Sequence, residues 1–182
     1  MIVAAANSIE KLRKQVAGKR VLLALSGGSD SSIVAHLLHE SDAMIRAVYL
    51  KGLDRPDDES HVREYFGREK WLDLSIAEAT ESFLDGLRGL ESPAYKRLGI
   101  WNVYKQVLDR ELREYGADYI SQGVLRSEFS VPQLMPLDGC SRNDSGAIGR
   151  AIGVPKALLM RLPYPCEGRA SRIEVEVTRD KL

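Results

Sequence analysis

The chain has 182 residues, enough for one domain with a core of its own. Its 26 basic and 26 acidic residues cancel, so no net field draws it onto a nucleic acid or a membrane. No apolar run approaches the roughly 20 residues of a membrane helix, and the N-terminus has no basic signal leader. These features predict a cytoplasmic protein whose partners are neither membranes nor nucleic acids.

The predicted elements alternate between helix and strand in chain order. A capping box at Asn7-Ser8-Ile9-Glu10 begins a helix that stops near Gly18. Strands are expected at 20–25, 45–50, 71–74 and 117–121. The helices between them are expected at 30–40, 58–66, 76–88 and 94–115. This alternation predicts an α/β fold with a doubly wound, mainly parallel, Rossmann-like sheet.

No repeat, low-complexity tract or linker divides the sequence. We therefore expect residues 1–182 to form a single domain, with an N-terminal helix at 1–18 and a helical or loop appendage at 140–182. Ligands of such sheets bind beyond the carboxyl ends of the strands. Those ends are Ser26-Gly27-Gly28, Leu50-Lys51-Gly52 and Gln122-Gly123, so the binding loops are expected along one edge of the sheet.

The stretch Ser26-Gly27-Gly28-Ser29-Asp30-Ser31-Ser32 joins an apolar strand to an apolar helix. Its glycines allow a sharp turn, and the amides and dipole at the helix start favour an anion. The serine hydroxyls add donors. Asp30 would repel phosphates unless it holds a magnesium ion that the phosphate oxygens share. The pattern predicts an ATP-phosphate loop with Asp30 as the metal ligand; a simple glycine turn before a helix is the structural alternative.

The loop lacks the Gly-Lys-Ser/Thr of a Walker sequence and the spacing of GxGxxG. It resembles the signature of the PP-loop ATP pyrophosphatases, whose fold is of the adenine nucleotide alpha hydrolase type. Those enzymes cleave ATP between the α and β phosphates, adenylate an oxygen of a substrate, and let a nucleophile displace AMP. The resemblance implies that ATP and Mg²⁺ are the cofactors and that the loop holds the leaving pyrophosphate.

Later stretches are similar to the ATP pyrophosphatase domain of GMP synthetase. They are Phe83-Leu84-Asp85-Gly86-Leu87, Ser92 to Arg97, Ala117 to Gly123, Pro163 to Ile173 and Glu176-Val177-Thr178. The likeness implies that Tyr49 and Leu50 meet the adenine through backbone groups and that Gln122 and Gly123 lie near the ribose. It also implies catalytic roles near the reacting phosphates or an anionic substrate for Lys96, Arg97 and Arg172. A solvated helix face or a surface ion pair is the alternative for these three.

The sequence also departs from that family. It ends at Leu182, where GMP synthetases continue into a dimerisation domain, and no amidotransferase domain precedes residue 1. Asn143 falls in the region of a family Lys-Asp-Glu segment, where Arg142 or Arg150 could replace the lysine. We expect adenylation of a carbonyl oxygen on a small, purine-like acceptor, for amination. The departures argue against xanthosine monophosphate as that acceptor.

Two alternatives remain open. Cys166 replaces a family glycine, and the run from Cys166 to Arg172 resembles the tail of sacrificial sulfur transferases. A thiolate near Arg169 would be nucleophilic, which predicts a sulfurtransferase. The second alternative is a non-catalytic nucleotide-binding subunit. The expected partners are a small-molecule acceptor and a separate ammonia- or sulfur-donating protein; a homo-oligomer is left open.

The cysteines and two of the histidines have simpler interpretations. Cys140 and Cys166 form no Cys-x-x-Cys pair, which favours reduced thiols over a zinc site. His36 and His39 fall inside the first helix after the loop, where a packing role is expected.

Overall fold

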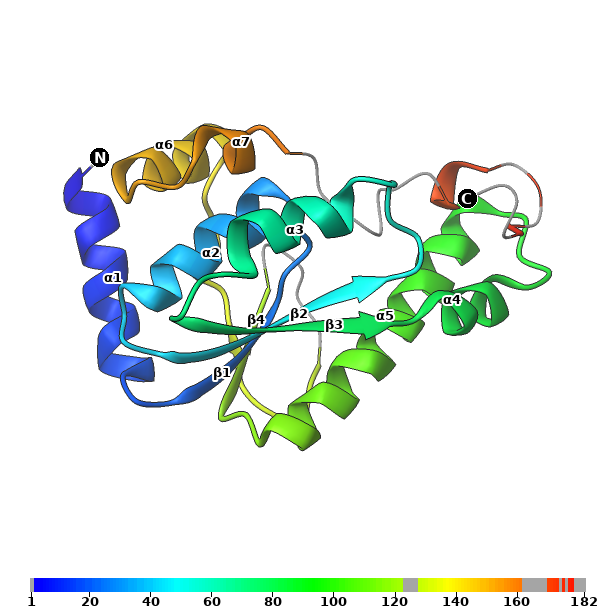
Figure 1. Cartoon of the computed structure of the whole chain (residues 1–182), viewed down its shortest axis with the longest axis horizontal. Helices are drawn as coiled ribbons and strands as arrows, with labels where there is room; N and C mark the ends of the chain where they lie inside the picture. The colour runs from blue at the N-terminus through cyan, green and yellow to red at the C-terminus, as the bar shows by residue number, and fades with distance from the viewer. Residues whose placement is uncertain (1, 123–127, 162–169, 174, 176, 179–182) are drawn as a thin grey trace.

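The computed structural model describes residues 2–122, 128–161, 170–173, 175 and 177–178. Five strands form one sheet in the order β3-β2-β1-β4-β5, and all its neighbours run parallel (Figure 1). The strands are β1 (Arg20–Ala24), β2 (Met44–Lys51), β3 (Leu72–Glu78), β4 (Tyr119–Ser121) and β5 (Gln133–Leu134). The predicted doubly wound parallel sheet is confirmed.

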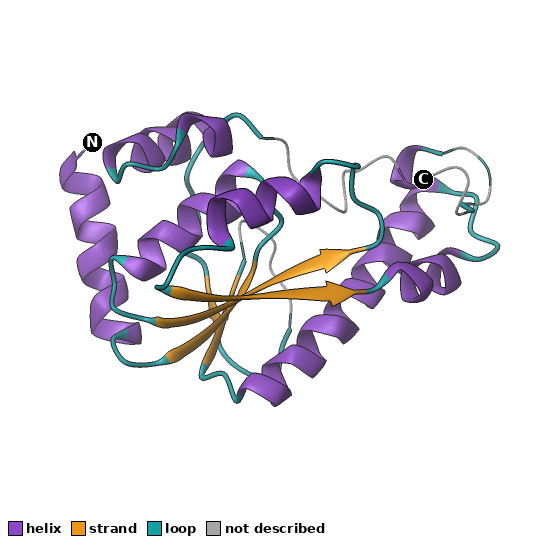
Figure 2. Cartoon of the chain, viewed as in Figure 1, coloured by secondary structure: helices purple, strands orange, loops and turns teal. Residues whose placement is uncertain are grey.

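Helices cover both faces of the sheet (Figure 2). The helices are α1 (Ile2–Val16), α2 (Ser29–His39), α3 (Asp58–Phe66), α4 (Thr80–Leu87), α5 (Pro93–Tyr115), α6 (Arg142–Ala151) and α7 (Lys156–Leu159), with a 3₁₀ turn at Ala170–Arg172. α2 and α3 lie on one face and the long α5 on the other. α1, α6 and α7 pack against α2 rather than against a strand.

The strand order reverses beside β1. The chain moves outward from β1 through β2 to β3, and then returns to β4 on the other side of β1. The connections after β1 and β4 therefore leave the sheet in opposite directions. In open parallel sheets, this reversal opens a crevice at the carboxyl ends of the two strands, which is where ligands bind.

The core explains why β1 is continuously apolar. Residues 21–25 are at most 2% exposed, as expected for a central parallel strand covered on both faces. On α2, Ile33, Val34, Leu37 and Leu38 are completely buried and follow helical spacing. The start of α2 is therefore fixed to the sheet through its own apolar face.

Two boundaries differ from the expected ones. The first helix begins at Ile2, so the expected capping box at Asn7-Ser8-Ile9-Glu10 lies inside α1 and does not begin it. The boundary between β3 and α4 also differs. We expected the strand to end at 74 and a helix to begin at 76, whereas β3 continues to Glu78 and α4 begins at Thr80. The stretch Ile76-Ala77-Glu78 pairs with Tyr49, Leu50 and Lys51 of β2. This pairing overrides the helical preference of alanine and glutamate.

No helix in the described part of the chain is long and apolar enough to cross a bilayer.

Candidate functional site

The loop between β1 and α2 depends on Gly27. Its φ is +73°, a conformation that favours glycine, and a Cβ there would lie 2.7 Å from Val62 Cγ2 of α3. Gly28 follows as the residue before α2 and offers no side chain to cap the helix. Because neither glycine carries a side chain, neighbouring residues or a ligand can approach the first turn of α2 closely.

Serine hydroxyls hold the shape of this loop. Ser31 Oγ accepts a hydrogen bond from the Ser26 amide at 3.2 Å and donates one to the Gly28 carbonyl at 3.1 Å. It also lies 3.0 Å from Ser26 Oγ, which accepts from the Gly28 amide at 3.3 Å. Ser32 Oγ is buried without a hydrogen-bond partner among the described residues. The expected loop of serines and glycines is thus a compact, internally bonded turn.

The amides at the start of α2 are only partly satisfied. The Ser29 amide donates to the Arg161 carbonyl at 3.3 Å. Helix geometry gives the next two amides, of Asp30 and Ser31, no partner inside the helix. With no capping side chain at Gly28, this turn keeps donors available for an anion.

Asp30 lies in the same first turn and is half-buried. Ser145 of α6 donates to its Oδ1 over 3.5 Å, which joins α6 to the loop. The described residues contain no cluster of three or more acidic, histidine or cysteine side chains that could hold a metal by themselves. A single carboxylate next to phosphates fits a magnesium ion that is bound mainly by its substrate. The assignment of Asp30 as its ligand remains a prediction.

A capping box fixes the start of α6. Ser141 Oγ accepts from the Asp144 amide at 3.2 Å, and Asp144 Oδ2 accepts from the Ser141 amide at 3.1 Å. The Ser141 hydroxyl also donates to Asp144 Oδ2, at 2.6 Å, and this hydrogen bond, followed by that of the Ser141 amide, holds the pKa of Asp144 below its ordinary value. The expectation of a helical or loop appendage at 140–182 gave no bounds for α6, although Ser-x-x-Asp before Ala147 and Ile148 is a recognisable start signal for a helix.

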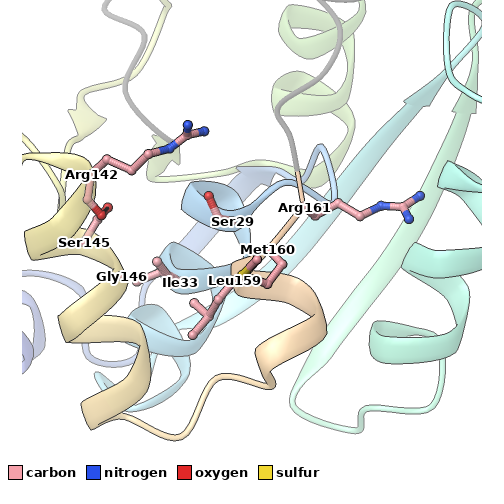
Figure 3. Close-up of a pocket in the computed structure, with 8 residues that line it drawn as sticks. All are labelled: Ser29, Ile33, Arg142, Ser145, Gly146, Leu159, Met160 and Arg161. Atoms are coloured by element: carbon pink, nitrogen blue, oxygen red, sulfur yellow. Dashed lines mark hydrogen bonds between the residues drawn. The ribbon is translucent and has the colours of Figure 1, made fainter.

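A cavity of about 240 Å³ opens where α2, α6 and the end of α7 meet (Figure 3). Its lining residues are Ser29, Ile33, Arg142, Ser145, Gly146, Leu159, Met160 and Arg161. Figure 3 shows Arg142 reaching from α6 toward the start of α2. Its guanidinium has no ion-pair partner within the described residues, so it is available to an anion held at α2.

The end of β2 extends beyond its pairing with β1, at the carboxyl edge of the sheet. β1 pairs with β2 only as far as Ala24 and Val48, whereas β3 follows β2 to Lys51. The side chains of Tyr49 and Leu50 are buried, and Tyr49 Oη donates to Asp54 Oδ2 at 2.8 Å. The prediction that these two residues meet an adenine through backbone groups is compatible with this arrangement and stays a prediction.

Lys96 and Arg172 lie with the C-terminal segment and not with the phosphate loop. Lys96 of α5 is fully buried, and its Nζ donates to the carbonyls of Ile173 and Val175, the latter at 2.6 Å. Arg97 and Arg172 are exposed. Figure 1 shows the 3₁₀ turn beside α4 and the start of α5, with α6 at the other end of the molecule.

The structure therefore joins Lys96 to the C-terminal segment and Asp30 to α6. Gln122 is buried directly after β4. Gly123 and Cys166 lie outside the described residues, as does the whole stretch from Pro163 to Arg169, which is part of the segment that carried the family likeness. The roles predicted for these residues stay predictions.

The histidines of α2 pack against aromatic rings. His39 stacks on Trp71 with ring centroids 4.4 Å apart, and His36 lies 5.5 Å from Trp71 and 6.2 Å from Phe66. Burial lowers the pKa of His36. These contacts agree with a structural role for both residues.

Comparison with known proteins supports the interpretation of the loop. A family model described as tRNA methyl transferase HUP domain matches residues 19–79, from β1 to the end of β3. The glutamine-hydrolysing GMP synthase of Latilactobacillus sakei is 33% identical over 201 residues, covering 96% of this chain and 39% of that protein. One subunit of the glutamine-hydrolysing GMP synthase of Methanococcus vannielii is 29% identical, over 97% of this chain and 64% of that subunit.

Solved structures agree on the fold. An NMN synthetase from Francisella tularensis superposes with a TM-score of 0.68 at 16% identity, over 97% of this chain and 80% of that one. An NAD⁺ synthetase from Burkholderia pseudomallei gives 0.64 at 16% identity, over 87% of this chain and 71% of that one. At this identity the likeness concerns the fold alone.

The resemblance to the PP-loop ATP pyrophosphatase superfamily is thus confirmed. Within that superfamily, it matches the ATP pyrophosphatase part of GMP synthases along nearly its whole length. It spans about two fifths of the length of the glutamine-hydrolysing GMP synthases that it matches.

Proposed function

We propose that this protein binds ATP with its phosphates on the Ser26–Ser32 loop and adenylates an oxygen of a small-molecule acceptor. Cleavage between the α and β phosphates would release pyrophosphate, and ammonia would then displace AMP. The observation that carries this proposal is the position of the loop. It lies at the carboxyl end of β1, where the strand order reverses, with uncapped amides on α2.

Electrostatic stabilisation of the leaving pyrophosphate is the catalytic effect that this site supports best. Negative charge grows on the β phosphate as its bond to the α phosphate breaks. The amides of α2 are fixed donors that favour such charge, and the Arg142 guanidinium adds a positive charge on the neighbouring wall of the cavity. A magnesium ion at Asp30 would neutralise more of it.

The acceptor is proposed from the relatives. The similarity to GMP synthases favours a purine-like carbonyl, and xanthosine monophosphate is the first compound to test. The match to a GMP synthase whose name describes it as one subunit of the enzyme supports ammonia supply by a separate chain. Sulfur transfer by Cys166 concerns a residue outside the described part of the chain, and the same assay without ammonia tests it, because the Cys166 thiolate would then displace AMP itself.

Release of pyrophosphate tests this function. Purified protein with ATP, Mg²⁺, xanthosine monophosphate and ammonia is expected to form pyrophosphate and AMP in equal amounts. Asp30→Asn should reduce the rate at least about 100-fold, because it removes the proposed metal ligand. Asp42→Asn is the control, since Asp42 is exposed and follows the opposite end of α2.

The outcomes separate the candidate functions. ATP binding without pyrophosphate release from any acceptor would favour a non-catalytic nucleotide-binding subunit. AMP release without ammonia, with a covalent bond formed between the Cys166 sulfur and the acceptor carbon that AMP leaves, would favour the sulfurtransferase; mass spectrometry would detect this adduct, and Cys166→Ser would lose it. Full activity in Asp30→Asn would contradict the role of Asp30.

A further inference from the structure

The geometry points to Arg161 as a positioning residue for the phosphate loop, which it ties to the connection between β2 and α3. This inference rests on the proposed function, because it concerns how the ATP site is held in shape. Arg161 follows α7 by two residues, far along the chain from both segments that it joins.

The backbone of Arg161 contacts the loop directly. Its carbonyl accepts the hydrogen bond of the Ser29 amide at 3.3 Å, at the first residue of α2. This carbonyl satisfies one of the amides that a helix start leaves without a partner. The position of the Arg161 backbone therefore helps to set the position of the turn that would face the phosphates.

The side chain of Arg161 is held at its other end. Nη1 lies 3.0 Å from Asp57 Oδ2 and Nη2 lies 2.7 Å from Asp58 Oδ1. Figure 3 shows this side chain leading away from Ser29, toward the side of α3. The Arg161 side chain is only 19% exposed and that of Asp58 only 3%, so the pairing is shielded from water more than a surface ion pair.

Asp58 is also fixed independently of Arg161. Arg55 Nη2 lies 2.8 Å from the same Oδ1, and the Arg55 amide donates to Oδ2 at 3.0 Å. Asp57 has a lowered pKa, chiefly because of its hydrogen bond with Arg161. The side chain of Arg161 is consequently attached to a rigid point at the start of α3.

A second contact brings α3 against the loop. Val62, one turn into α3, occupies the space that a side chain at Gly27 would need. The loop is therefore held from two directions, by Val62 on Gly27 and by the Arg161 carbonyl on Ser29. Loss of the Arg161 guanidinium would keep the carbonyl but remove the ion pairs that fix its position, and would leave the contact of Val62 intact. The turn would then be more mobile in the free protein and would lose more conformational entropy when ATP binds.

The affinity for ATP in Arg161→Met tests this role. This substitution keeps an apolar stem and the backbone carbonyl, but removes both ion pairs. Calorimetric titration of the full chain with MgATP should show binding weaker on the order of tenfold. Arg161→Lys, which can keep one ion pair, should recover part of the loss. All titrations are made at a temperature where each variant is folded by circular dichroism.

Arg46→Met is the matched control. Arg46 also joins two separate elements, through an ion pair of 2.7 Å with Asp73, but it lies near the amino ends of the strands. It should lower the unfolding midpoint without changing the affinity for ATP. A general loss of stability would therefore be distinguished from loss of loop positioning.

Asp57→Asn gives a test that does not depend on the folding of Arg161→Met. Asp57 is exposed, so the substitution should be tolerated. A positioning role predicts about two- to threefold weaker binding, and no further loss when Asp57→Asn is added to Arg161→Met. If Arg161 acted only by screening acidic charge from the phosphates, Asp57→Asn would instead tighten binding.

Two failures are distinguishable. Equal ATP affinity in wild type and Arg161→Met, or tighter binding in Asp57→Asn, would overturn the positioning role and leave the proposed function standing. Absence of ATP binding to the wild-type chain would overturn the proposed function, and the positioning role with it.

Discussion

Gly27 shows at the scale of one residue why the phosphate loop has its sequence. Its left-handed backbone and its contact with Val62 both exclude a side chain. The sequence pattern predicted a glycine turn here, but the neighbour that closes the space comes from α3. Such a contact leaves no mark in the local sequence.

Gly27→Ala should therefore lower the free energy of unfolding by about 3 kcal/mol and abolish tight ATP binding. Gly18→Ala is the control, because Gly18 has a similar φ of +68° but open space around it. That substitution should lower the free energy of unfolding by only about 1 kcal/mol. Urea unfolding measures both, and equal losses would contradict the steric part of the argument.

His36 predicts a pH dependence of stability. Burial holds its pKa in the folded state below the ordinary 6.5, so the unfolded chain binds the proton more readily. The stabilising contribution is present above pH 6.5 and is lost as the pH falls toward the folded-state pKa.

Urea unfolding of the wild type at pH 7.5, 6.5 and 5.5 should therefore show decreasing stability. In His36→Asn the decrease should be smaller, although not absent, because burial also lowers the pKa of His61. An unchanged slope in His36→Asn would show that His36 titrates as it does in water.

The residues that form ion pairs across the site could not be predicted from the sequence. Arg161 and Asp57 are 104 positions apart, and each stands in an ordinary polar stretch. The residues of the phosphate loop, by contrast, are consecutive in the sequence, from Ser26 to Ser32. This is why the loop was predictable and the residues that hold it were not.

At the scale of elements, local signals were reliable where helix and strand alternate regularly. β1, α2, β2, α3 and α5 lie within one or two residues of their expected bounds. β3 extends further because β2 supplies pairing partners as far as Lys51. β5 is only two residues long, too short to show a strand pattern, and its pairing with β4 defines it.

The capping box of α6 carries a prediction at this scale. Ser141→Ala removes an acceptor for the Asp144 amide and should lower the free energy of unfolding by about 1 kcal/mol. Because α6 presents Arg142 and Ser145 to the loop, MgATP should also bind more weakly. Ser60→Ala, on the exposed face of α3, is the control for both measurements. Unchanged stability in Ser141→Ala would mean that α6 does not depend on its cap.

At the scale of the whole molecule, the alternation of strands and helices was sufficient to predict the parallel sheet. Right-handed crossovers and short connections leave few arrangements for such a sequence. The sequence did not show that α6 and α7 pack on α2, because that contact joins segments more than 100 residues apart. The packing of α6 is what brings Arg142 to the phosphate loop.

Lys96 links distant parts of the chain in the same way. Lys96→Met removes the donor to the Ile173 and Val175 carbonyls and should expose this segment to protease. Limited digestion with thermolysin and mass spectrometry should show faster cleavage near Ile173. Lys105→Met, on the same helix but paired with Asp109 one turn away, should leave the cleavage rate unchanged. Equal cleavage in Lys96→Met and wild type would contradict the anchoring role.

The most direct test of the central claim is the identity of the products formed from ATP. Phosphorus NMR of a reaction with Mg²⁺, xanthosine monophosphate and ammonia distinguishes the two bonds that can break. Cleavage between the α and β phosphates, as proposed for the Ser26–Ser32 loop, predicts AMP and pyrophosphate. Formation of ADP and inorganic phosphate would contradict the account.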